Sequence, residues 1–380
     1  MSDLRLVSRL ERLVGFDTQN PPGCETECAA FIAGELAELG FFVERDDFAP
    51  GRANIVGRLE NGPGPTFAFN THMDVVPAGE GWTGDPFTLR AHGEQLIARG
   101  ACDAKGPLAA MIEAMALLAA DRRSWSGTLL GAFVADEEAA SAGARRYASS
   151  RPVIDFVVVG EPSGNAPIIA HKGSLRPVVR VGGLSAHSGT PDLGLNAIYQ
   201  AAKLIPHIEA CHARLRERVH PLVGPPSLTV TRVMAGVADN MVPASCELTF
   251  DRRMVPGEQE DVALAEIEAL LAAIQTSEGI ELEIAALKPT TGGAAETDAN
   301  HPVVLKALAA ARRHGVENAQ PLGFQGACDF VHFRSIGAEG VVLGPGDLAV
   351  AHKPDEFVPR QELIAAALIY ADIARGMMAA

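Results

Sequence analysis

The feature that most constrains this fold is a set of short, nearly continuous apolar segments separated by helical patterns. Residues 128–135 and 156–159 carry almost no polar side chain, which is typical of strands buried on both faces of a parallel sheet. Residues 41–45, 54–59 and 66–70 are further strand-like segments. Strands that alternate with helical patterns predict an α/β fold, with a mainly parallel sheet and helices on both faces.

The pattern changes near Gly173. The following stretch lacks strict alternation and contains predicted strands or helices at 174–181, 196–218, 227–233, 246–251, 258–277 and 281–285. This order is typical of an α+β domain with an antiparallel sheet. The α/β pattern returns from about residue 290, and a chain of 380 residues is too long for one ordinary core. We therefore expect a main domain formed by 1–173 and 290–380, with an inserted domain at 174–289.

Composition excludes several classes of function. The formal net charge of −15 argues against binding to nucleic acid or to anionic membranes. No segment reaches the roughly 18 apolar residues that span a bilayer, and the N-terminus lacks the apolar block of a signal peptide. The six cysteines are scattered without a CxxC motif, and Cys28 follows a helical period that predicts a core position. These features predict a cytoplasmic protein with reduced thiols.

Candidate functional side chains follow several of the predicted strands, where ligands bind in open α/β sheets. Five motifs contain, in chain order, His72 with Asp74, then Asp103, Asp136-Glu137-Glu138, Glu161 and His352. Each alone has an ordinary structural explanation. Asp103 could cap a helix, and the three successive acids could form the first turn of another. Their joint occurrence indicates a functional site.

The residue types in these motifs indicate a metal centre. Two histidines and three carboxylates without a thiolate suit zinc, manganese or cobalt. A histidine such as His72 can bind a metal through one ring nitrogen while Asp74 takes the other N–H. One aspartate can bridge two ions, and of the adjacent Glu137 and Glu138 one can ligate while the other transfers protons. Two ions about 3.5–4 Å apart can activate a bridging water, which predicts metal-assisted amide hydrolysis.

In this order the motifs resemble those of the co-catalytic zinc amidohydrolases and metallopeptidases. That family includes acetylornithine deacetylase, succinyl-diaminopimelate desuccinylase, aminoacylase and glutamate carboxypeptidase. The resemblance covers essentially the whole chain and implies a zinc-peptidase-like catalytic domain with an inserted lid and dimerisation domain. It implies two divalent ions, zinc first and cobalt or manganese as alternatives. The implied ligands are His72 and Glu161 for one ion, Glu138 and His352 for the other, and Asp103 as the bridge.

The resemblance also implies roles for residues that hold no metal. Asp74 would orient His72, and Glu137 would act as general acid/base on a metal-bridged water. A cis peptide is implied between Asp103 and Ala104. Glutamate at position 161, where aminopeptidase relatives carry aspartate, favours deacylase or carboxypeptidase chemistry.

The inserted segment resembles the lid of the same family. His187, in Gly183-Leu-Ser-Ala-His-Ser-Gly189, would reach the substrate carbonyl, in some members from the partner subunit. Arg253 matches the arginine of the pattern D-x-R-x-x-P-G and would grip a substrate carboxylate. Arg252 is a rival because adjacent strand residues face opposite ways. Asn240 is a further substrate-binding candidate.

Three functions remain open at this point. The leading one is acetylornithine deacetylase-like removal of an acyl group from an N-acyl L-amino acid, which details such as Ala170-His-Lys-Gly173 favour. Succinyl-diaminopimelate desuccinylase and a carboxypeptidase or dipeptidase are alternatives, because Gly326-Ala-Cys-Asp329 departs from the loops of several relatives. A non-catalytic binding protein should have lost Glu137 or a ligand, and none is missing. The expected partners are a small-molecule substrate and a second copy of the chain.

Overall fold

The computed structural model describes residues 3–379 and divides the chain into two units. One unit comprises residues up to Ile169, Glu296–Gly323 and Cys328 onwards, and the other comprises Ala170–Ala295 with Phe324–Ala327. The second unit therefore begins before the predicted boundary at 174 and ends after the predicted boundary at 289. The later end has a structural reason, because a strand of this unit continues to Gly292 against its neighbour.

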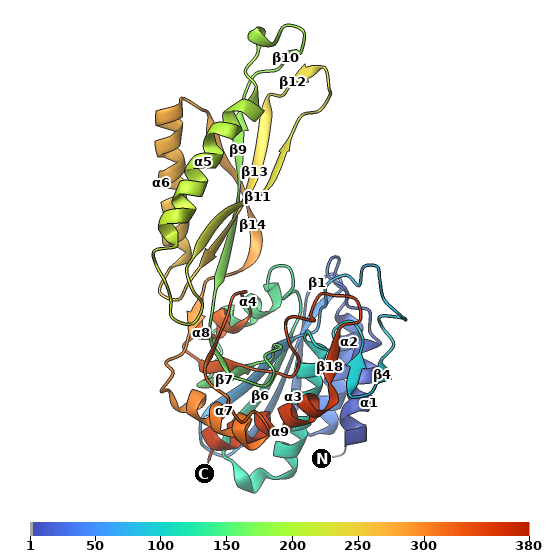
Figure 1. The fold of residues 1–380 in the computed structure, drawn as a ribbon. Coiled ribbons are helices and arrows are strands. Elements are labelled where there is room, and N and C mark those ends of the chain that lie inside the picture. Colours follow the sequence, from blue (N-terminus) through green and yellow to red (C-terminus); the bar gives the residue numbers. More distant parts are fainter. Residues whose placement is uncertain (1–2, 380) are drawn as a thin grey trace. The chain divides into compact units, whose positions relative to one another are not determined.

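The largest sheet has nine strands in the order β1-β2-β6-β3-β7-β17-β8-β15, with β16 paired to β8 (Figure 1). Their bounds are β1 Phe42–Ala49, β2 Arg52–Asn61, β3 Thr66–His72, β6 Gly127–Val134, β7 Phe156–Val159, β8 Ile168–His171, β15 Ala295–Glu296, β16 Leu322–Phe324 and β17 Glu339–Val342. β3 runs parallel to β6 and β7, and β7 runs parallel to β17. The central strands are the buried apolar segments of the sequence, so the expected α/β class is confirmed.

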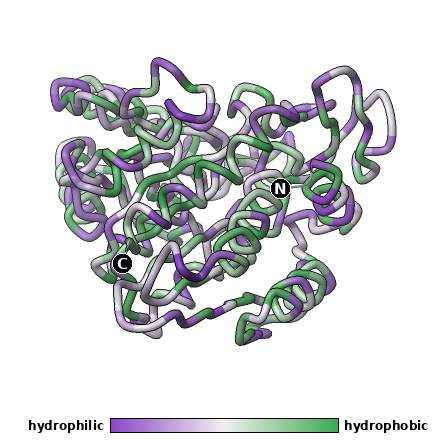
Figure 2. The backbone as a smooth tube through the Cα atoms, turned by 90° about the horizontal axis from the view of Figure 1, so that it is seen from below, coloured by the Kyte–Doolittle hydropathy of each residue, from purple (hydrophilic) through white to green (hydrophobic). Residues whose placement is uncertain are grey.

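Helices cover this sheet on both faces. Their bounds are α1 Asp3–Val14, α2 Thr26–Glu38, α3 Lys105–Ala120, α4 Ala142–Ser149, α7 Pro302–Arg313, α8 Phe330–Ser335 and α9 Arg360–Met377. α3 packs against α1 and α9, whereas α4 packs against α8. Many helices carry both hydrophobic and hydrophilic stretches, as expected when one side faces a core (Figure 2). α2 ends before Gly40, whose φ of 85° lies in the left-handed region that favours glycine.

The second unit is an α+β sandwich, as the sequence predicted. Its antiparallel sheet has the order β11-β13-β9-β14, and two long helices, α5 and α6, pack on one face of it. The bounds are β9 Gly173–Gly182, β11 Ser227–Ala235, β13 Ser245–Met254, β14 Leu282–Gly292, α5 Ala197–Leu215 and α6 Glu260–Glu278. A separate pair of short strands is formed by β10 Ala186–His187 and β12 Met241–Val242.

The remaining elements are short. A three-stranded sheet joins β18 Phe357–Pro359, β5 Gln95–Ile97 and β4 Arg90–His92. Two 3₁₀ helices span Arg122–Ser124 and Pro191–Leu193. No helix within residues 3–379 is both long and apolar enough to cross a bilayer.

Candidate active site

The topology of the large sheet gathers the predicted ligands at one edge. His72 is the last residue of β3, and Glu161 follows β7. Glu138 follows β6, and the loop after β17 carries His352. Because β6, β3, β7 and β17 are adjacent and parallel, their carboxyl ends meet at the same edge. Motifs far apart in the sequence thereby reach one place.

Asp103 lies between the two histidines. Its Oδ1 is 3.2 Å from Nε2 of His72, and its Oδ2 is 3.3 Å from Nε2 of His352. Glu138 Oε2 lies 3.2 Å from His352 Nε2, and Glu161 Oε1 lies 3.9 Å from His72 Nε2. One histidine and one glutamate thus stand on each side of an aspartate that turns one oxygen to each pair.

The donor set could hold a metal ion. Ligand atoms of His72, Asp103 and Glu138 lie within 4.8 Å of one another, and so do those of His72, Glu137 and Glu161. Oε1 of Glu138 and Oε1 of Glu161 are buried without a hydrogen-bond partner in the structure. Bonds to Asp103 and Glu138 raise the pKa of His352 to about 10. A cluster that attracts protons this strongly also offers a favourable environment for metal ions.

Glu137 faces the same cluster as the ligands. Burial, together with the negative charge of Glu161, raises the pKa of Glu137 well above the usual glutamate value. A raised pKa makes the carboxylate a stronger base, which suits a group that accepts and returns a proton. Glu137 also belongs to the set with His72 and Glu161, so distance alone does not separate its proton-transfer role from a ligand role.

The loop that holds these acids is not helical. The helix that follows β6, α4, begins only at Ala142, four residues after Glu138. Asp136 and Ser141 both have positive φ angles, of 71° and 49°, which interrupt a helix between the strand and α4. Asp103 likewise does not cap α3, because no side-chain capping bond is present there. The capping and first-turn explanations of these acids are therefore excluded.

Asp74 supports both the histidine and the acidic loop. Nδ1 of His72 lies 2.9 Å from the backbone oxygen of Asp74 and 3.6 Å from its Oδ1. The Asp74 carboxylate accepts backbone N–H bonds from Glu137 and Glu138, each at 3.1 Å. It is fully buried, and although burial raises its pKa, the bonds to His72 and Asn20 outweigh this and lower it. The aspartate therefore fixes the positions of groups on two neighbouring strands.

Sequence analysis missed a supporting network around Asn20. Its Nδ2 donates to Asp74 at 2.8 Å and to Asp136 at 2.9 Å. Arg52 Nη2 donates to Asn20 Oδ1 at 2.8 Å and lies 3.0 Å from Asp136. In the sequence, Asn20-Pro-Pro-Gly23 indicates a break between two helices, but nothing in it indicates a contact of Asn20 with the site.

A second missed residue, Glu356, holds the loop of Asp103. Its Oε1 accepts N–H bonds from Cys102 and Asp103, each at 2.9 Å, and its carboxylate pairs with buried Arg99. The pairing of β18 with β5 brings this glutamate, which follows the His352 loop, to the Asp103 loop. The expected cis peptide between Asp103 and Ala104 is confirmed.

The predicted substrate residues lie in the second unit. His187, in β10, is exposed and pairs with Met241 of β12. The backbone oxygen of Asn240 accepts a hydrogen bond from the Ser188 N–H at 3.0 Å. Arg253 lies on β13, where its Nε donates to Asp251 at 2.6 Å.

Arg252 has a different environment from Arg253. It is buried and pairs with Glu258 at 2.7 Å. The Arg253 side chain keeps 29% exposure. The exposed guanidinium of Arg253 is therefore the one that a ligand can reach.

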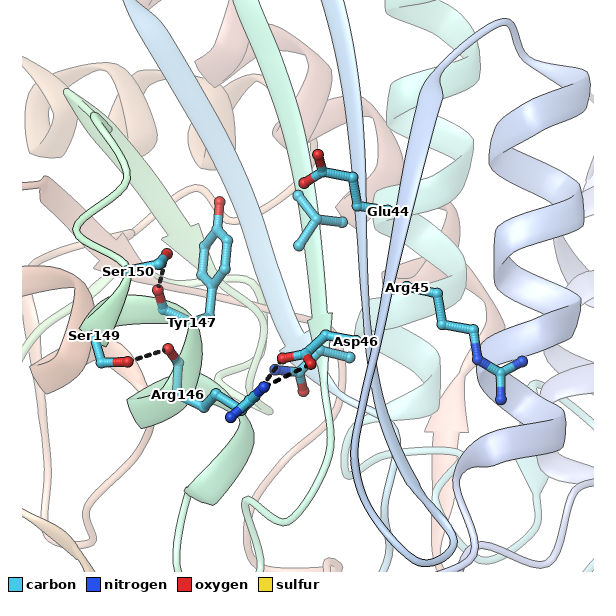
Figure 3. A pocket seen from close by; sticks show the side chains of 9 residues that line it. Glu44, Arg45, Asp46, Arg146, Tyr147, Ser149 and Ser150 are labelled. Carbon is cyan, nitrogen blue, oxygen red and sulfur yellow. Dashed lines mark hydrogen bonds and ion pairs between the residues drawn. The ribbon is translucent and has the colours of Figure 1, made fainter.

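A surface pocket elsewhere in the first unit does not belong to this cluster (Figure 3). It lies beside β1, β2 and α4 and is lined by Glu44, Arg45, Asp46, Asn54, Val56, Arg146, Tyr147, Ser149 and Ser150. An ion pair between Arg146 and Asp46 crosses it. None of the predicted site residues lines this pocket.

The fold and the cluster together define a metallohydrolase of the α/β class with a second α+β unit. Residues 68–376 match the model of peptidase family M20/M25/M40, and the chain belongs to this family. The members of this peptidase family are hydrolases that cleave amide bonds. The resemblance inferred from the motifs is thereby confirmed.

Individual relatives agree with this assignment. An acetylornithine deacetylase of Proteus mirabilis is 33% identical over 339 residues, which cover 86% of this chain and 84% of the relative. Among solved structures, an aminopeptidase of Bacillus cereus has a TM-score of 0.79 at 21% identity, with 99% of both chains covered. A dinuclear metal-binding peptidase of Bacillus subtilis has a TM-score of 0.74 at 19% identity, with 99% of this chain and 98% of the other covered.

Proposed function

We propose that this protein removes the acyl group from N-acyl L-amino acids, as an acetylornithine deacetylase-like amidohydrolase. The observation that carries the proposal is Asp103, whose two carboxylate oxygens each face a different histidine. The named function of the Proteus mirabilis relative, at 33% identity over most of both chains, supports the deacylase assignment.

Two divalent ions complete the proposed site. His72 and Glu161 would hold one, Glu138 and His352 the other, and Asp103 would bridge them. Zinc is the first choice for this nitrogen and oxygen donor set, with cobalt and manganese as alternatives. When bound, the ions supply a water of lowered pKa and polarise the amide carbonyl. The dinuclear Bacillus subtilis neighbour supports this stoichiometry.

Glu137 is the proposed general acid/base. Its raised pKa lets its carboxylate take a proton from the attacking water and return it to the leaving amine. Asp74 assists by holding the backbone of Glu137 and the ring of His72. Burial of His72, Asp103 and Glu161 strengthens their electrostatic interactions, whereas the His352 side chain keeps 53% exposure.

The second unit supplies the proposed substrate contacts. Arg253 binds the substrate carboxylate, Asn240 assists in binding, and His187 donates to the carbonyl oxygen.

We further propose a homodimer formed through this unit, which exposes Leu184, Leu193, Tyr199 and Val237. His187 would then act within its own chain or on its partner's substrate. All six cysteines are free, which supports a reducing cytoplasmic compartment.

A substrate panel tests this proposal. Acetylornithine, succinyl-diaminopimelate, other N-acyl amino acids and dipeptides are each assayed with added zinc, manganese and cobalt. We expect the highest kcat/KM with an N-acyl amino acid. A clear preference for succinyl-diaminopimelate would favour the desuccinylase alternative, and a preference for dipeptides would favour the peptidase alternative. Turnover of none of them by metal-loaded protein would contradict the proposed function.

A further inference from the structure

Lys172 is a buried lysine without an acidic partner in the part of the chain that the structure describes, residues 3–379. The residue is only 8% exposed, and its Nζ donates to the backbone oxygen of Pro225 at 2.7 Å. Lysines are rarely buried unless a negative charge compensates them. Burial lowers the pKa of Lys172, and the positive charge of Arg253 lowers it further. An anion beside Nζ would compensate the buried charge and offset the repulsion from Arg253.

The strand register brings Lys172 and Arg253 to the same end of one sheet face. In the pairing of β13 with β9, Arg253 stands opposite Ser174, and Arg252 stands opposite Leu175. Leu175 belongs to the core beneath α5 and α6, so Ser174 and Arg253 face the other side of the sheet. Lys172 precedes Ser174 by two residues, which is the spacing of side chains on one face of an extended chain.

Positive charge exceeds negative charge at this end of the sheet. Asp251 accepts from Arg176 Nε at 2.8 Å and from Arg253 Nε at 2.6 Å. The single carboxylate of Asp251 thus holds two guanidinium groups, and Lys172 adds a third cation close by. Asp251 accepts from both Nε and Nη2 of Arg253, so Nη1 and the second N–H of Nη2 remain able to bind a further carboxylate.

We propose that Lys172 and Arg253 bind the substrate carboxylate together. The inference rests on the proposed function for the presence of a free carboxylate, and it adds a residue to which no role has been given. Arg253 presents paired N–H groups in one plane, and Lys172 contributes a compact charge from the side. Arg176 acts through Asp251 and is a positioning residue.

The test compares N-acetylornithine with its α-carboxamide. Affinities are measured by calorimetry on metal-loaded Glu137→Ala protein, which is expected to bind without turnover, and KM is measured in the active background. Lys172→Gln keeps a donor for the Pro225 oxygen but removes the charge, and Lys172→Arg keeps the charge. Arg180→Met is the matched control, because Arg180 lies on β9, the strand that follows Lys172, but pairs with Glu247 and Glu283.

We expect Lys172→Gln to weaken binding of the free acid about tenfold or more and to leave the carboxamide nearly unchanged. Lys172→Arg should retain most of the affinity, and Arg180→Met should retain all of it. Equal losses for acid and amide, an unchanged affinity for the acid, or no binding of the acid to the parent protein would overturn the role of Lys172. A parent that binds these probes while the active enzyme hydrolyses none of the panel would refute the proposed function and leave the carboxylate site standing.

Discussion

Asp103 and Glu137 differ in what their surroundings do to a carboxylate. Both are buried, and burial alone raises the pKa of each. For Asp103, the bonds to His352 and His72 outweigh burial and lower the pKa. For Glu137, the charge of Glu161 adds to burial and the pKa is raised. The same cluster therefore favours the ionised form of Asp103, the proposed bridge, and the protonated form of Glu137, the proposed acid/base.

Glu137→Ala tests this division of roles. We expect kcat to fall by about 10²-fold or more, because a positioned acid/base contributes about 10²–10⁴-fold. Metal content measured by elemental analysis should stay that of the parent. Loss of metal together with activity would mean that Glu137 is a ligand. Glu138→Ala is the matched variant and should lose metal.

Arg253→Ala tests the carboxylate contact. We expect KM for N-acyl amino acids to rise about tenfold or more, since hydrogen bonds to charged groups contribute about 1.5–3 kcal/mol. The preference for free acids over their amides should narrow in the same variant. Arg252→Ala should instead lower the melting temperature, because Arg252 is buried against Glu258. A selective KM effect from Arg252→Ala alone would reverse the assignment.

At the scale of elements, a buried ion pair joins α1 to α3. Glu113 of α3 is fully buried and accepts from Arg9 of α1 at 2.8 Å, and it also pairs with Arg5. Burial raises the pKa of Glu113, but the two arginines outweigh burial and hold it below its usual value. α3 begins directly after the Asp103 loop, so this pair anchors the helix that follows a proposed ligand.

Glu113→Ala should lower the free energy of unfolding by about 1.5–3 kcal/mol, because it removes a charged hydrogen-bond partner of buried Arg9, which keeps its pair with Glu35. The folded-state pKa of Glu113 is depressed, so its contribution is complete above its unfolded pKa of about 4.3 and is lost as pH falls through its folded pKa. Chemical denaturation at pH 7 and at low pH measures both effects. Asp47→Ala removes an exposed pair with Arg45 and should change stability by less than about 1 kcal/mol. Equal effects of the two variants would contradict this account.

At the scale of the whole molecule, the proposed machinery is divided between the two units. All five proposed ligands belong to the first unit, and His187, Asn240 and Arg253 belong to the second. The proposed ligands and the proposed substrate residues therefore lie in different units.

Metal-saturated protein should contain two divalent ions per chain. The physical reason is the arrangement of two histidine and glutamate pairs around Asp103. Elemental analysis after removal of free metal measures the stoichiometry, and a chelator should abolish activity reversibly. A value near one would exclude the bridging role of Asp103, and trace binding would exclude the metal centre.

Hybrid dimers test whether His187 serves its own chain or its partner. If it acts on the partner's substrate, mixing Glu137→Ala with His187→Ala protein should restore part of the activity, because one site of the hybrid has both groups intact. Subunit exchange is verified with differently tagged chains. Exchange without recovered activity would assign His187 to its own chain or remove it from the mechanism.

The sequence by itself determined the residues of the candidate site and the class of the fold. Buried strands such as Phe156–Val159 are visible as apolar runs, and polar residues placed after them mark the edge where ligands bind. The change to an α+β pattern near Gly173 could be read in the same way. These are local properties, because each depends on residues that are close together in the chain.

Only the tertiary structure decided which side chains support that site. Asn20 contacts Asp74 and Asp136 across 54 and 116 residues, and Glu356 contacts Asp103 across 253 residues. The burial of Lys172 and Arg252 also depends on the packing of β13 against β9, two strands that are far apart in the sequence. A hydrogen bond between distant segments leaves no periodic pattern in the sequence. It depends on which two segments the fold brings together, and not on the residues adjacent to each partner in the chain. Strand register and helix packing together set the order of the sheet, and the order of the sheet decides which distant side chains meet the motifs.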